Sequence, residues 1–228
     1  MWNREGQVTF AVLNLKSVPP HRHSLSLALE ISNYVGIIAF AVSGSIKAVK
    51  KGMDLLGVLV LGFVTALGGG IISDVLLGKV PPVNLTYYPY PLVAFASSLA
   101  TFFLADRIER LNHALIYADA LGLSAFAVSG ASLAYSVDNN FLLVVSVGTI
   151  TAVGGGVIRD LMASEVPMVL TREFYASAAI LGSSTYFALR ELGLTDAITS
   201  TVAFAVTLAL RLLAIRYKLE LPRPKVRA

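Results

Sequence analysis

Long apolar segments separated by short polar or proline-containing breaks dominate the hydropathy pattern of this chain. A helix needs about 20 mainly apolar residues to cross a bilayer. Seven segments approach that length, and Pro81, Pro82 and Pro167 fall between them, where helices are expected to end. The expected spans are residues 26–49, 54–78, 89–106, 112–137, 140–163, 173–190 and 195–215. The pattern predicts an all-α integral membrane protein with seven transmembrane helices.

The apolar pattern also repeats after 86 residues, without a gap. The motif G-x-x-A-F-A-V-S-G at residues 36–44 returns at 122–130, and T-A-x-G-G-G-x-I-x-D at 65–74 returns at 151–160. Repeats of membrane-length segments interrupted by glycines are typical of proteins that form a pathway through a membrane. The sequence therefore directs attention to the residues that both copies share.

Each repeat accounts for three of the expected helices. Residues 26–106 form the first three-helix repeat, residues 112–190 form the second, and 195–215 remain as a seventh helix. An odd number of helices makes the second copy enter the membrane from the opposite side. The repeats are therefore expected to be inverted, related by a pseudo-two-fold axis in the membrane plane, with the two triple-glycine segments facing each other near the bilayer centre.

Composition agrees with a membrane protein. The chain is 56% hydrophobic and 14% charged, with a mean hydropathy of +0.73, whereas soluble domains carry about 25% charged residues. There is no cysteine, which excludes disulfides, thiolate metal sites and cysteine catalysis. The pI of about 9.4 would suit nucleic acid, but its basic residues are better explained as membrane anchors, so no nucleic-acid partner is expected.

Charge also predicts an orientation. With the N-terminus outside, the inward-facing segments carry 12 lysines and arginines against 5 on the other side, in the sense of the positive-inside rule. Residues 1–25 would then be an extracytoplasmic segment, and residues 216–228 a basic cytoplasmic tail beside anionic lipid. The expected location is the plasma membrane of a prokaryote.

The glycine triplets Gly68–Gly70 and Gly154–Gly156 are the first candidates for chemistry. Each glycine weakens a helix by about 1 kcal/mol relative to alanine in water. A kink or short unwound stretch would free backbone carbonyls, which suit a partly dehydrated cation in a protein-lined, hydrated gap. The alternative is that these glycines only let helices pack closely.

Polar groups near the triplets extend this candidate pathway. Asp74 and Asp160 each follow a triplet by four residues, on the same helix face. A charge inside a span costs roughly 2.5–3.5 kcal/mol, so it should face water or a partner; interfacial carboxylates, with Arg159 as a local partner, are the alternative. The candidate pathway residues are Phe40, Ser43, Gly44, Thr65, Gly68, Gly69, Gly70, Asp74, Phe126, Ser129, Gly130, Thr151, Gly154, Gly155, Gly156, Arg159 and Asp160.

Three lysines, Lys47, Lys50 and Lys51, end the first span, and the second copy has no counterpart to them. They are expected to be cytoplasmic anchors in contact with lipid, with a role in gating as the alternative. An enzyme is not expected, because the three histidines lie outside or at the edge of the spans and cannot activate the serines. No metal-ligand spacing occurs either, so neither a metal site nor a cofactor is expected.

The paired F-A-x-S-G and T-A-x-G-G-G-x-I-x-D motifs, with the seventh span, resemble the prokaryotic trimeric intracellular cation (TRIC) channels over residues 30–215. The resemblance implies a homotrimer with a pore in each protomer, lined by the second and fifth helices bent at their glycines. It implies passage of monovalent cations, chiefly potassium, with sodium as a second permeant ion. Some bacterial members are described as small-amino-acid transporters, so a secondary transporter for glycine remains the alternative, and a non-transporting scaffold is a third class.

Overall fold

The computed structural model describes residues 27–107, 111–171 and 174–217. The predicted segment 1–25 and residues 218–228 of the basic tail lie outside the described residues. The elements are α1 (Leu27–Lys50), α2 (Leu55–Leu76), α3 (Val83–Thr86), α4 (Pro89–Leu104), the 3₁₀ helix η2 (Ala105–Arg107), α5 (Leu111–Tyr135), α6 (Phe141–Met162), α7 (Met168–Thr171), α8 (Ala176–Glu191) and α9 (Asp196–Tyr217).

Each of the seven expected spans coincides with a long helix, and the bounds differ by three residues or fewer. Among the described residues, α1, α2, α5, α6 and α9 are long and apolar enough to cross a membrane. Helices α4 and α8 have 16 residues each, which is short for a span. The all-helical membrane architecture is confirmed, while the count of seven spans stays a prediction.

The repeat is visible in where the helices begin. Asp54 caps α2 by accepting a hydrogen bond from the backbone N–H of Gly57, and Asn140 caps α6 in the same way from Leu143. These two caps satisfy N–H groups that a helix start leaves free. The short helices α3 and α7, which the hydropathy pattern does not indicate, follow α2 and α6 at corresponding places.

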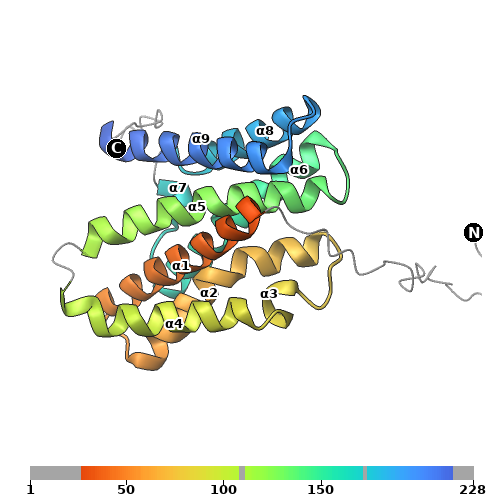
Figure 1. Cartoon of the computed structure of the whole chain (residues 1–228). Helices are drawn as coiled ribbons and strands as arrows, with labels where there is room; N and C mark the ends of the chain where they lie inside the picture. The colour runs from red at the N-terminus through yellow and green to blue at the C-terminus, as the bar shows by residue number, and fades with distance from the viewer. Residues whose placement is uncertain (1–26, 108–110, 172–173, 218–228) are drawn as a thin grey trace, which may run out of the picture.

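Helices α1, α2, α5 and α6 form the centre of the molecule. Figure 1 shows α8 and α9 along one side and α4 along the opposite side, and α4 packs on α1 and α2 as α8 packs on α5 and α6. The ring of Phe40 lies against Gly122, and the ring of Phe126 lies against Gly36. Such reciprocal contacts are those of a two-fold axis. The contacts are thus reciprocal between the two repeats, and their inverted arrangement in the membrane stays a prediction.

The glycine triplets lie where α2 crosses α6, and they are buried there. A Cβ atom on Gly69 would collide with the carbonyl oxygen of Thr151, and one on Gly155 would collide with that of Thr65. Both helices continue through their triplets without a break, so the prediction of a short unwound stretch is wrong. In the described conformation the glycines let two helix backbones come into contact, which is the alternative role that the sequence analysis left open.

Candidate functional site

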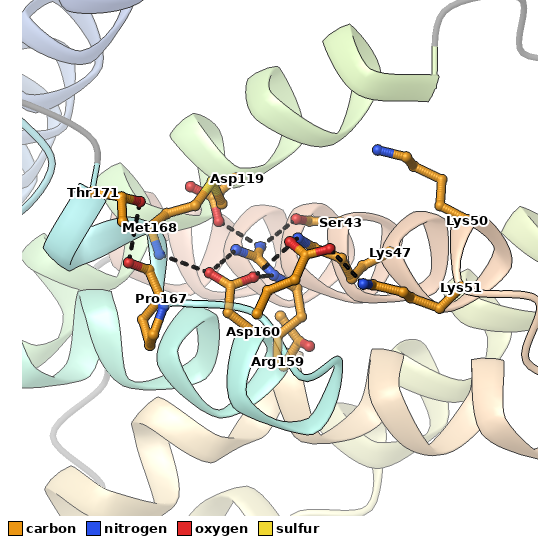
Figure 2. Close-up of polar contacts among 12 residues, drawn as sticks. Ser43, Lys47, Lys50, Lys51, Asp119, Arg159, Asp160, Pro167, Met168 and Thr171 are labelled. Atoms are coloured by element: carbon orange, nitrogen blue, oxygen red, sulfur yellow. Dashed lines mark hydrogen bonds and ion pairs between the residues drawn. The ribbon is translucent and has the colours of Figure 1, made fainter.

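Arg159 lies at the centre of a buried polar cluster. Its side chain is 0% exposed, and its Nη1 donates to Ser43 Oγ on α1 and to Asp119 Oδ1 on α5, both at 2.6 Å. Its Nε and Nη2 reach the two oxygens of Asp160 at 3.0 and 3.2 Å. Tyr175, just before α8, donates to the same oxygen of Asp119 at 3.1 Å. Figure 2 shows the guanidinium between Ser43, Asp119 and Asp160. The arginine thus connects α1, α5 and α6.

A chain of ion pairs continues from this cluster towards the end of α1. Lys47 Nζ lies 3.4 Å from Asp160 and 2.5 Å from Glu165, and Lys51 Nζ lies 2.8 Å from the other oxygen of Glu165. Lys47 is only 6% exposed and lies in ion pairs within the protein, whereas the expectation from sequence was a cytoplasmic anchor in contact with lipid. The carboxylates of Asp160 and Glu165 neutralise the lysine, which makes its burial tolerable. Lys50 bonds to Asn112 at the start of α5.

The two aspartates at the ends of α2 and α6 hold the short helices that follow. Asp74 Oδ2 accepts from the backbone N–H of Val83 at 2.9 Å and from Asn84 Nδ2 at 3.1 Å. Asp160 Oδ2 accepts from the backbone N–H of Met168 at 2.8 Å. Carboxylates are favourable at the N-terminus of a helix, where N–H groups lack partners. Both aspartates are nearly fully buried and have partners within the protein, as a charge inside a span requires.

The positions equivalent to the arginine cluster in the first repeat carry a weaker network. Asn33 lies 86 residues before Asp119, and its Oδ1 accepts from Ser129 Oγ on α5. Its Nδ2 donates to Tyr90 OH at 3.5 Å, whereas in the other repeat the tyrosine, Tyr175, donates to Asp119. The residue in the place of Arg159 is Ser73, whose hydroxyl bonds to Gly70 of its own helix. The same framework is therefore neutral in one repeat and charged in the other.

The other candidate residues are packed between helices. The rings of Phe40 and Phe126 have centroids 5.3 Å apart and lie in the core beside Ile37 and Leu123. The hydroxyls of the two repeated threonines bond to carbonyls one turn back in their own helices, and each threonine faces a glycine on the neighbouring helix: Thr65 faces Gly44, and Thr151 faces Gly130. These residues fix the crossings of α1 with α2 and of α5 with α6.

The comparisons with known proteins agree with this arrangement of helices. A family model described as Glycine transporter matches residues 30–106 and 116–191. The UPF0126 inner membrane protein YadS of Escherichia coli K12 is 41% identical over 192 residues, covering 82% of this chain and 92% of that protein. A UPF0126 membrane protein of Deinococcus radiodurans is 42% identical over 169 residues, covering 73% and 79%. The chain is thus a multi-pass membrane protein.

Solved structures decide the family. A TRIC cation channel structure has a TM-score of 0.81 and 63% sequence identity, and the match covers 87% of this chain and 98% of that one. A TRIC orthologue from Rhodobacter sphaeroides has a TM-score of 0.81 and 34% identity, covering 84% and 98%. The chain belongs to the TRIC channel family. The resemblance drawn from the repeated motifs is confirmed.

Several residues of the cluster in this TRIC family member are not among the sequence-based candidates: Asn33, Asp119, Glu165 and Tyr175. Asp119 is fully buried, and it lies within the predicted span 112–137, where a carboxylate is costly and marks a partner or a pathway. That signal was sufficient to find it. The repeat alone conceals it, because the equivalent residue is the neutral Asn33.

Glu165 predicts how this TRIC family member responds to acid. Hydrogen bonds from Lys47 and Lys51 lower the pKa of Glu165 from 4.5 to about 2. A carboxylate with a lowered pKa stabilises the folded state above its ordinary pKa, and this contribution is lost as the pH falls from 4.5 towards 2. In thermal unfolding of the detergent-solubilised protein, the wild type should exceed Glu165→Gln in Tm at neutral pH, and the difference should shrink below pH 4.5.

The control for this experiment is Asp138→Asn, which removes an exposed carboxylate just after α5. Its Tm difference from the wild type should be small throughout, because exposed charges contribute little to stability. An equal Tm for the wild type and Glu165→Gln at pH 7 would show that the lysine pairs do not stabilise the fold.

Proposed function

We propose that this protein is a passive cation channel that prefers potassium and also admits sodium, with one pore in each protomer. The observation that carries the proposal is the similarity to a solved TRIC cation channel, at 63% identity and a TM-score of 0.81. The triplet motif occurs once in each repeat, at residues 65–74 of α2 and at residues 151–160 of α6. This repetition supports α2 and α6 as the helices that line the pore.

The contact between α2 and α6 supports a closed conformation. At Gly69 and Gly155 the two backbones touch, so no ion passes between these helices at that level. Conduction then requires α2 and α6 to separate or bend at the triplets, where the absence of side chains makes this inexpensive. Asp74 and Asp160, on the two sides of the crossing, would attract cations and disfavour anions along the path that opens.

The same similarity supports the proposed assembly, and the charge pattern supports the proposed setting. A related protein is named a trimeric channel, and we propose a homotrimer for this chain. The excess of lysine and arginine on one side supports an orientation with the N-terminus outside and the C-terminus in the cytoplasm. The expected membrane is the plasma membrane, with lipids and monovalent cations as partners.

Transport of glycine is the second candidate, favoured by the description of the matching family model. A transporter binds its substrate in a closed site and turns over slowly, whereas a channel passes ions down their gradient in a continuous path. A scaffold role makes a third prediction, that neither ions nor glycine cross.

Proteoliposomes separate these functions in one preparation. Vesicles loaded with KCl and containing the purified protein are expected to release potassium rapidly and to show no saturable uptake of labelled glycine. Asp74→Asn and Asp160→Asn should each lower the potassium flux, because each removes one charge of the path and one anchor of α3 or α7. Saturable glycine uptake without potassium release would replace the channel proposal with the transporter, and protein-free vesicles give the background.

A further inference from the structure

Two groups of residues occupy equivalent places in the two repeats. The Asp119 half-site is Ser43, Asp119, Arg159 and Tyr175, and the Asn33 half-site is Asn33, Ser73, Tyr90 and Ser129. Three of these pairs are separated by 86 residues, and the two tyrosines stand at the starts of α8 and α4. Ser129 of the second repeat bonds directly to Asn33 of the first. Ser43 of the first repeat is connected to Asp119 of the second through Arg159, which donates to both. The pseudo-two-fold axis therefore relates two versions of one polar site.

The Asp119 half-site holds a cation supplied by the protein. The guanidinium of Arg159 is bound by Ser43 Oγ and by Asp119 Oδ1, which also accepts from Tyr175. Both Arg159 and Asp119 are 0% exposed. Lys47 adds a second positive charge beside Asp160. Two cations thus balance the two buried carboxylates of this half.

The Asn33 half-site has the same oxygen groups without these cations. Ser73 stands in the place of Arg159, and Leu133 stands in the place of Lys47. The carboxylate that corresponds to Asp160 is nevertheless kept, as Asp74, which is 2% exposed. Lys79 lies in the loop after α2 and interacts electrostatically with Asp74. It does not occupy the position equivalent to Arg159 or to Lys47. This half therefore keeps a buried carboxylate, Asp74, but has no counterpart of the positive charges of Arg159 and Lys47.

We propose that the Asn33 half-site binds one monovalent cation, in the place that the Arg159 guanidinium occupies in the other repeat. The proposal rests on the proposed function, because the ion bound would be the one that the channel conducts. The ligands would be Asn33 Oδ1, Ser129 Oγ and Tyr90 OH, and the ion would replace the hydrogen bonds that join these side chains in the described conformation. Asp74 acts on Tyr90 electrostatically, so its charge lies nearby. The hydroxyl hydrogens can rotate so that oxygen lone pairs face the ion.

The chemistry of this half-site suits a permeating ion. Neutral oxygens with a single nearby carboxylate hold a monovalent cation weakly, whereas a tight divalent site needs several carboxylates. Conduction requires a site that an ion enters readily and leaves readily. Asn33 and Ser129 are also half-buried, whereas Asp119 and Arg159 are not exposed. The first half-site is therefore less enclosed than the second, whose space is filled by its own arginine.

Anomalous scattering from thallium, which replaces potassium, tests the proposal on crystals of the full-length protein. Thallium is expected at the Asn33 half-site and absent from the Asp119 half-site. The variant Asn33→Leu should abolish the peak, and Ser129→Ala should raise the potassium concentration for half-maximal conductance by roughly threefold to tenfold, the equivalent of one lost ligand.

The double variant Asp119→Asn with Arg159→Ser converts the second half-site to the residues of the first. It removes one positive and one negative charge together, and a second thallium peak is expected at that place. If the wild type passes potassium but holds no thallium at the Asn33 half-site, the inference is overturned while the channel proposal survives. If the wild type passes no cation at all, the proposed function fails, and thallium bound at the Asn33 half-site would then still support the site itself.

Discussion

Replacing Gly69 or Gly155 by alanine is expected to push α2 and α6 apart and to destabilise the folded protein by about 1–3 kcal/mol. The added methyl group of either variant collides with a backbone carbonyl, of Thr151 or of Thr65, and a backbone carbonyl cannot turn aside as a side chain can. Alanine also favours the helix by about 1 kcal/mol over glycine in water. The expected loss therefore comes from packing between helices and occurs despite a gain in helix propensity.

Gly68→Ala is the matched control, one residue away in the same triplet. Its methyl group meets the Cδ1 atom at the flexible end of Ile158, at 2.9 Å. The side chain can move, so the Tm of this variant in detergent should stay close to that of the wild type. Equal Tm values for Gly68→Ala and Gly69→Ala would contradict the tight crossing. A Gly69→Ala protein that still folds should also open more often in bilayers, because its closed contact is weakened.

The second large effect is expected from Arg159→Ser, which places the first-repeat residue in the second repeat. Asp119 would then be a carboxylate with 0% exposure and without its arginine. Removing one partner of a buried ion pair costs about 3–5 kcal/mol, because the other charge stays buried and uncompensated. A strong loss of Tm, or of folded protein in size-exclusion chromatography, is the expected result.

Two further variants test whether the loss of stability comes from the uncompensated carboxylate or from the loss of a large arginine side chain. Adding Asp119→Asn to Arg159→Ser removes the uncompensated carboxylate and should recover most of the lost stability. Arg190→Leu is a control for loss of an arginine elsewhere, because Arg190 donates to the Leu194 carbonyl and lies over the ring of Tyr135 at a part-buried place. Should the double variant be no more stable than Arg159→Ser alone, the ion pair would not explain the burial of Arg159.

The helices of this protein could be predicted from sequence because bilayer length and the repeat constrain them independently. The capping residues Asp54 and Asn140 lie 86 residues apart and begin α2 and α6 at equivalent places. The short helices α3 and α7 could not be predicted from hydropathy, because each is four residues long. Their starts depend on Asp74 and Asp160, whose partners are fixed only when the chain folds back.

The behaviour of the triplets could not be derived from helix propensity. Propensity measured in water predicts a weak point at Gly68–Gly70. In a membrane, a broken helix leaves polar backbone groups without water, so the backbone keeps its own hydrogen bonds. The missing side chains of Gly69 and Gly155 then serve contact with the opposite helix. The sequence singled out the triplets as weak points of a helix, whereas in the structure they serve as a helix contact.

The charged cluster was only partly accessible from sequence for a different reason. Arg159 and Asp160 were singled out because they lie at the end of a repeated motif. Asp119 lies 40 residues earlier on another helix, and Glu165 lies in the segment after α6, where it covers Lys47. Pairings between helices depend on how the two repeats dock. The repeated residues alone could not supply them, since the two copies differ most where the charges lie.

The most direct test of the central claim, a cation-conducting pathway between two inverted repeats, is single-channel recording of the purified protein in planar bilayers with a KCl gradient. The account predicts stepwise currents that reverse near the potassium equilibrium potential, with chloride contributing little. Absence of stepwise currents, or a reversal potential near zero because chloride and potassium permeate equally, would contradict it.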